Sequence, residues 1–125
     1  IAEEHKGSKT YGPLIHNKDE ITRLKEGFNI GLAEKFDDVA PDDSVVIRTH
    51  GIPKNELSQL KAQENEIIDA TCPYVTTPQN IVEKMSNEGY SIVIFGDKDH
   101  PEIKGVVSYA KDLKNAFIIL DEKEL

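Results

Sequence analysis

Residues 45–53 are Val45-Val46-Ile47-Arg48-Thr49-His50-Gly51-Ile52-Pro53, which is the order of a strand, a loop and the start of a helix. The apolar residues occupy consecutive positions, as is typical of a strand buried on both faces in a parallel sheet covered by helices. Proline suits the first position of a helix, because the N–H that it lacks would have no partner there. The stretch therefore predicts a strand–loop–helix cassette with His50 in its loop.

The same order recurs along the chain. Short apolar runs bounded by polar or turn residues predict strands at Ser44–Ile47, Glu66–Asp69, Ser91–Phe95 and Asn115–Leu120, with weaker candidates at Lys9–Tyr11 and Asn29–Leu32. Apolar residues three and four apart predict helices at Asp19–Phe28, Lys54–Ala62, Thr77–Asn87 and Pro101–Ala110, and the last turns of another at Ile1–Lys6. This alternation predicts an α/β fold built on parallel sheet.

Composition excludes several classes of protein. The chain of 125 residues has 23 acidic and 15 basic side chains, a formal net charge of −8, which argues against a nucleic-acid partner or an anionic membrane surface. No apolar run approaches the roughly 20 residues of a membrane span. Cys72 is the only cysteine, which excludes an internal disulfide framework and a metal centre built from this chain's thiolates alone. We expect a soluble protein of a reducing compartment and, because Ile1 opens the chain in mid-pattern, a piece of a longer one.

The reactive side chains share one place in the predicted topology. His16, His50, Cys72 and His100 each follow a predicted strand and precede a predicted helix. Ligands of open α/β sheets bind at the carboxyl edge of the strands, where helix N-termini favour anions and imidazole N–H groups can donate to phosphate oxygens. The cassettes therefore predict an anionic, phosphorylated ligand.

Each of these residues also has a structural interpretation. A histidine at a strand end is often a turn residue or a helix cap. Cys72 could be a small buried hydrophobic residue, but its loop position equally favours a metal ligand or a nucleophile. Glu102, in the first turn of a helix, could complement the helix dipole or donate a proton beside His100. The residues alone leave these alternatives open.

Four motifs in order resemble one family, the 4-hydroxy-3-methylbut-2-enyl diphosphate reductases, which are iron–sulfur enzymes of the non-mevalonate route to isoprenoids. The motifs are Gly12-Pro13-Leu14-Ile15-His16-Asn17, Thr49-His50-Gly51, Asp69-Ala70-Thr71-Cys72-Pro73 and Gly96-Asp97-Lys98-Asp99-His100-Pro101-Glu102. The resemblance implies three similar α/β units around a pseudo-threefold axis, of which this chain covers about one and a half. Residues 1–72 would be the first unit without its start, and residues 73–125 part of the second.

The resemblance also assigns roles. It implies a [4Fe–4S] cluster held by three cysteines, of which Cys72 matches the middle one, while the other two would lie outside this chain. His16, His50 and His100 match the histidines that bind the diphosphate of the substrate, and Glu102 matches the acid that supplies protons. The products would be isopentenyl and dimethylallyl diphosphate, the electrons would come from ferredoxin or flavodoxin, and the enzyme would be cytoplasmic.

Two other functions remain open beside this enzyme. The chain could be a phosphate-binding α/β module in which Cys72 is structural, or Cys72 could be a nucleophile paired with a histidine, which requires a base within hydrogen-bonding reach. Because one of three cluster ligands is present, we expect the fragment alone to be inactive.

Overall fold

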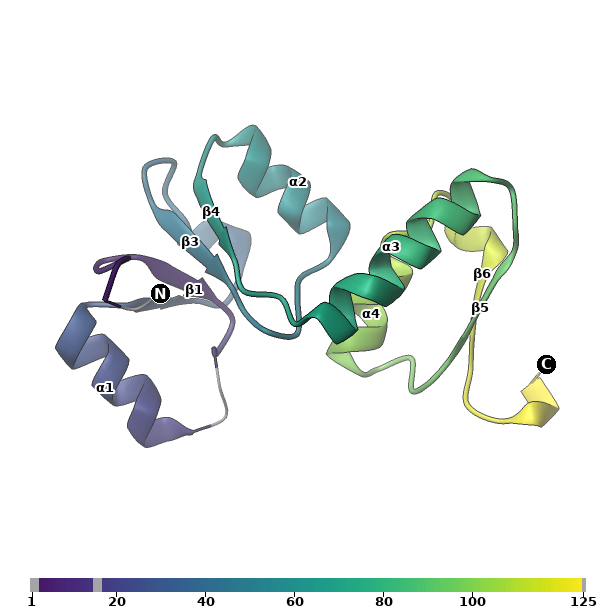
Figure 1. Cartoon of the computed structure of the whole chain (residues 1–125), viewed down its shortest axis with the longest axis horizontal. Coiled ribbons are helices and arrows are strands. Elements are labelled where there is room, and N and C mark those ends of the chain that lie inside the picture. The colour runs from purple at the N-terminus through teal and green to yellow at the C-terminus, as the bar shows by residue number, and fades with distance from the viewer. Residues whose placement is uncertain (1–2, 15–16, 125) are drawn as a thin grey trace.

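The computed structural model describes residues 3–14 and 17–124 of the chain, and Figure 1 shows how its elements are arranged. His16 lies outside the described residues, as do Ile1 and Ala2. The elements are β1 (Lys9–Tyr11), α1 (Lys18–Phe28), β2 (Gly31–Ala33), β3 (Ser44–Ile47), α2 (Lys54–Ala62), β4 (Glu66–Asp69), α3 (Pro73–Asn87), β5 (Ile92–Phe95), α4 (Pro101–Val107) and β6 (Ala116–Ile119), with short 3₁₀ turns at Phe36–Asp38, Leu113–Asn115 and Glu122–Glu124.

All strand pairs in the described residues are parallel, which confirms the predicted α/β class. One sheet has the order β2-β1-β3-β4, and a second consists of β5 and β6. In Figure 1 the four-stranded sheet lies on the left, with α1 and α2 on either side, and β5 and β6 lie on the right with α3 and α4. The division into units at residue 72 stays a prediction.

Strand β3 is buried on both faces, as its consecutive apolar residues predict. Val45 and Ile47 pack in one cluster with Leu60 of α2, and all three are at most 2% exposed. Val46 points to the other face and is 1% exposed. Burial of each such side chain contributes about 1.5–3 kcal/mol, so β3 anchors the loop that carries His50.

The expectation of burial on both faces is wrong for β5 and β6. Val93 and Phe95 are 52% and 69% exposed, and Phe117 of β6 is 50% exposed. Ile92, Val93 and Ile94 line a cavity together with residues of α3 and α4. The helices thus cover one face of this two-stranded sheet, and no other described element covers the second.

Helix α3 begins four residues before its predicted start at Thr77. Pro73 occupies the first helical position, and the backbone N–H groups of Val75 and Thr76 donate to the carbonyl of Cys72 at 2.8 and 3.0 Å. Pro78 lies inside the helix, although proline there removes a hydrogen bond. Burial of Val75, Gln79 and Val82 along one face of α3 outweighs this loss.

Smaller differences concern element ends. Residues Glu3–Gly7 form turns, so the predicted helix end is wrong over the described part of that segment. Helix α4 stops at Val107 rather than Ala110, and β2 is displaced to Gly31–Ala33. Helix α1 begins at Lys18, because the Asn17 side chain accepts hydrogen bonds from two backbone N–H groups of the first turn.

The two parts of the chain meet at the start of α2. The Lys54 backbone N–H donates to Ser108 Oγ at 2.9 Å, and the Lys54 ammonium lies 2.6 Å from the Glu83 carboxylate. These contacts join the start of α2 to the second half of α3 and to the residue that caps the end of α4. Within the described ranges, no helix is both long and apolar enough to cross a membrane.

Candidate functional site

Two strand–helix loops from different sheets form one cavity. Arg48 and His50 come from the loop between β3 and α2, and His100, Pro101 and Glu102 come from the start of α4. They line a cavity of about 170 Å³. The structure therefore brings the predicted site residue His50 together with His100 and Glu102, which lie 50 and 52 positions further along the sequence.

His100 is held by the first turn of α4. Its Nδ1 accepts a hydrogen bond from the Glu102 backbone N–H at 3.2 Å, and its own backbone N–H donates to the Asp97 carbonyl at 3.0 Å. An accepting Nδ1 leaves Nε2 to carry the proton of the neutral ring. His100 is thus a helix cap, as one interpretation predicted, and its remaining ring nitrogen can also donate to a ligand.

His50 is held by a tight turn and by the neighbouring strand loop. Gly51 follows it with a φ of +69°, and the Gly51 backbone N–H donates to the Arg48 carbonyl at 2.9 Å. The Cys72 backbone N–H donates to the Thr49 carbonyl, also at 2.9 Å. The main chain that carries Cys72 is therefore bonded directly to the loop that carries His50.

Gly51 has no room for a side chain. A Cβ atom there would lie 2.9 Å from Gln79 Nε2 and 3.2 Å from Thr71 Cγ2, and its positive φ disfavours any L side chain. We expect Gly51→Ala to destabilise the full-length protein by about 1–2 kcal/mol in denaturant unfolding and to weaken phosphate binding by displacing His50. Gly27→Ala is the matched control, because nothing lies within 4 Å of that position. Wild-type stability of Gly51→Ala would contradict this packing.

Cys72 lies at the N-cap position of α3, half-buried, and its side chain makes no capping hydrogen bond. The preceding turn is fixed by Asp69, whose Oδ1 accepts from the Thr71 N–H and hydroxyl at 2.9 and 2.5 Å. Among the described residues no side chain hydrogen-bonds to the thiol, so the base that a nucleophile requires is not seen. Nor do the described ranges contain a group of three side chains able to hold a metal ion.

Sequence reasoning missed Arg48 at this site. The feature of the sequence that could have indicated Arg48 is its position: a cationic residue at the carboxyl end of a buried apolar strand, directly before Thr49-His50. Arg48 also borders a second cavity of about 360 Å³, together with Tyr11, Glu56 and Lys104. In that second cavity, burial and a hydrogen bond with Glu56 raise the pKa of the Tyr11 phenol far above its usual value, so the phenol stays protonated.

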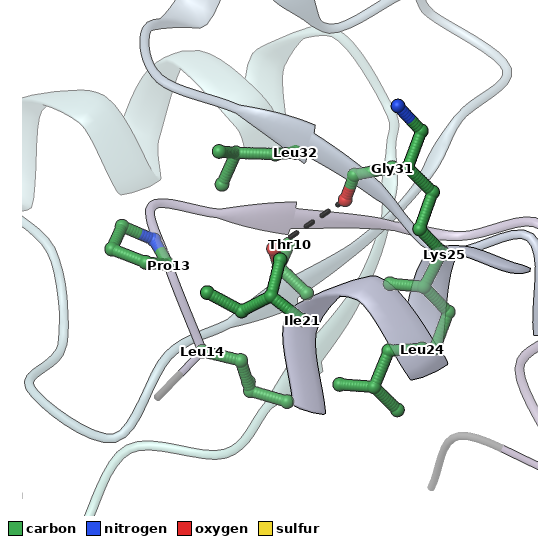
Figure 2. A pocket seen from close by; sticks show the side chains of 9 residues that line it. Thr10, Pro13, Leu14, Ile21, Leu24, Lys25, Gly31 and Leu32 are labelled. Atoms are coloured by element: carbon green, nitrogen blue, oxygen red, sulfur yellow. Dashed lines mark hydrogen bonds between the residues drawn. The ribbon is translucent and has the colours of Figure 1, made fainter. Parts of the chain in front are cut away.

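A third cavity, of about 180 Å³, lies between α1 and the strands β1 and β2. Figure 2 shows Leu14, Ile21 and Leu24 gathered in it, and the Thr10 hydroxyl donating to the Gly31 carbonyl at 3.4 Å. None of the predicted site residues that the structure describes borders it. Its lining is mainly aliphatic, so we interpret it as a packing gap rather than a reactive site.

Comparison with known proteins agrees with the resemblance carried by the motifs. A 4-hydroxy-3-methylbut-2-enyl diphosphate reductase of Sulfurovum sp. is 86% identical over all 125 residues, which span 45% of that protein. The corresponding reductase of Nitratiruptor sp. is 61% identical over 125 residues, which span 44% of its length. The chain thus spans less than half of the relatives that it matches.

Solved structures share the fold. The structure of (E)-4-hydroxy-3-methyl-but-2-enyl diphosphate reductase, described as the terminal enzyme of the non-mevalonate pathway, matches with a TM-score of 0.80 and 34% identity over 98% of this chain and 45% of the other. The reductase structure from Plasmodium falciparum matches with a TM-score of 0.85 over 98% of this chain and 39% of the other; at 23% identity it supports the fold alone.

The family assignment covers the entire chain. The family model described as LytB protein matches residues 1–125 without a gap at either end. This match extends through both sheets and every predicted site residue, so the chain belongs to the LytB protein family.

Proposed function

We propose that this chain is part of a reductase that converts 4-hydroxy-3-methylbut-2-enyl diphosphate to isopentenyl and dimethylallyl diphosphate. The observation that carries the proposal is the single cavity formed by His50, His100 and Glu102, residues that the motifs assign to this reaction. The 86% identical reductase of Sulfurovum sp. supports it. The test is an anaerobic assay of the full-length protein with this substrate and a chemical reductant, in which both products should form.

The histidines serve as donors to the diphosphate. His100 can present Nε2–H, because its Nδ1 is already an acceptor for the Glu102 N–H. His50 enters the same cavity from the other loop, and we assign His16 to the same task from its motif. Hydrogen bonds to a charged acceptor are stronger than neutral ones, so histidines fixed by the backbone can orient this end of the substrate.

Glu102 moves the proton. Loss of the substrate hydroxyl as water needs a proton at that oxygen, and the Glu102 carboxyl is the acid that borders the cavity. The Glu102 backbone N–H donates to the His100 ring, so the proposed proton donor, Glu102, and the proposed diphosphate-binding residue, His100, belong to the same helical turn. The net reaction takes up two electrons and two protons, breaks the C–O bond, forms a C–H bond and releases water.

Cys72 fits one ligand of an iron–sulfur cluster. The residue is partly accessible, its side chain is not used as a helix cap, and it lies at the start of a 15-residue helix. Further ligands must come from outside this chain, because it contains no other cysteine. When bound, the cluster would supply the two electrons, delivered to it by ferredoxin or flavodoxin.

The division of the chain into α/β units and its cellular location are part of the same proposal. Residues 1–72 would belong to the first α/β unit and residues 73–125 to the second, and the separate sheets on either side of Cys72 support this division. A free thiol and a reductive reaction suit the cytoplasm.

The isolated 125-residue chain is expected to be inactive. Anaerobic reconstitution with iron and sulfide should leave less than one cluster per chain and no measurable turnover, because one thiolate cannot hold a cluster stably. The measurement is iron content with visible absorption, followed by the product assay. A stoichiometric cluster with turnover would show that Cys72 is not one of several required thiolates.

A phosphate-binding module is the second candidate. It is favoured by the fact that the cavity joins imidazoles and a guanidinium, whereas Cys72 is not among its lining residues. Under this alternative the full-length protein would bind inorganic pyrophosphate but would bind no cluster and form no reduced product.

A further inference from the structure

Arg48 occupies a position in the cavity that the proposed function does not use. It follows the last residue of β3, two positions before His50, and borders the cavity that also contains His100 and Glu102. Its Nε is buried and has no hydrogen-bond partner in the described part of the chain. Burying a charged hydrogen-bond donor without an acceptor costs folding free energy. A bound ligand that accepts a hydrogen bond from this nitrogen would remove that cost.

The guanidinium is held by packing rather than by a carboxylate. It lies against Gly12, where a Cβ atom would be 2.8 Å from Arg48 Nη1 and 2.9 Å from Cζ, and where φ is +73°. Glu34 and Glu56 border the neighbouring cavity, but neither forms an ion pair with Arg48 in the described ranges. A planar cation is therefore held in place without an ion-pair partner among the described residues.

The charge balance of the cavity indicates what would compensate it. The other polar side chains that the structure describes in its lining are two imidazoles and the Glu102 carboxyl, in a chain of net charge −8. Among the described residues of that lining, Arg48 is the only permanently cationic side chain. A diphosphate entering beside an acid needs such a cation to offset the repulsion, and a guanidinium matches the oxygens of a phosphate with two parallel N–H donors.

We propose that Arg48 binds the diphosphate of the substrate directly and supplies the formal positive charge of its binding site. This deepens the proposed function and rests on it for the identity of the substrate, but the anion contact can be tested without any reduction. The histidines would then act as hydrogen-bond donors that set orientation, while Arg48 supplies a permanent positive charge.

The test compares Arg48→Gln and Arg48→Lys in the full-length holoenzyme, with inorganic pyrophosphate as probe in calorimetry. We expect Arg48→Gln to weaken pyrophosphate binding by about 10- to 100-fold and to raise the KM for the allylic diphosphate by a similar factor, with a smaller change in kcat. Arg48→Lys keeps the charge but loses the planar donor pair, so it should recover part of the affinity. Added salt should weaken wild-type binding more steeply than that of Arg48→Gln.

Arg23→Gln is the matched control, because Arg23 is an exposed residue of α1 that pairs with Glu20 and takes no part in the cavity. Wild-type affinity and salt dependence in both Arg48 variants would overturn the proposal and leave Arg48 a packing residue against Gly12. If Arg48→Gln does not fold, Arg48→Lys decides alone, since unchanged pyrophosphate affinity there excludes a two-donor contact. A wild type that binds pyrophosphate through Arg48 but reduces nothing would refute the proposed function and leave the anion contact standing.

Discussion

Replacing Cys72 with serine in the full-length protein is expected to abolish the visible absorption of its iron–sulfur cluster and to reduce turnover below detection. A serine hydroxyl keeps the size of the side chain but is not a thiolate, and Cys72 is the only thiol that this part of the protein contributes. The measurement is iron content and the visible spectrum after anaerobic purification, together with the product assay.

Pyrophosphate binding should survive this change, since Cys72 is not among the residues that line the cavity. The conservative variant Thr71→Ser is the neighbouring control, because serine keeps the hydroxyl that donates to Asp69. A full cluster in Cys72→Ser would exclude Cys72 as a ligand and favour the binding module with a structural cysteine.

Glu102→Gln is expected to keep the cluster and the affinity for the diphosphate but to lower kcat by about 10²- to 10⁴-fold, the usual contribution of a positioned acid. Glutamine preserves the shape of the side chain, and the hydrogen bond to His100 comes from the backbone N–H of residue 102, so the turn should remain intact. The measurement is kcat and KM under saturating reductant, with the visible spectrum recorded on the same sample.

Glu122→Gln removes the same charge from an exposed 3₁₀ turn far along the chain and should leave kcat unchanged. Activity of Glu102→Gln within twofold of wild type would remove Glu102 from proton transfer. A variant that loses cluster as well as activity would instead assign Glu102 a structural part in holding the site.

The four-stranded sheet was predictable because local pattern and tertiary environment agree there. Val45, Val46 and Ile47 are apolar on consecutive positions and are buried on both faces of β3. The same pattern in β5 failed, because Val93 and Phe95 remain more than half exposed. An apolar run shows that a side chain can be buried, whereas the elements that cover it are set by the rest of the fold.

The helix ends and the candidate site also depend in part on tertiary packing that the local sequence does not show. The sequence pattern predicted that helix α3 begins at Thr77. In the structure α3 begins at Pro73, and its first turns bury Val75 and Gln79. The strand-end position of His50 and His100 predicted that they share a ligand, and the cavity brings them together. Arg48 carried only the weak signal of a cation at a strand end, and its place in one cavity with His100 depends on how the two sheets meet, which no local pattern encodes.

The central claim is that this chain carries the diphosphate-binding and proton-donating part, with one cluster ligand, of an allylic diphosphate reductase. Its most direct test is an anaerobic titration of the full-length protein with a measured amount of reductant in excess diphosphate substrate. We predict one molecule of isopentenyl or dimethylallyl diphosphate for every two electrons consumed, with no product from Cys72→Ser under the same conditions. Binding of the substrate without consumption of electrons, or product formation by Cys72→Ser at the wild-type rate, would contradict the claim.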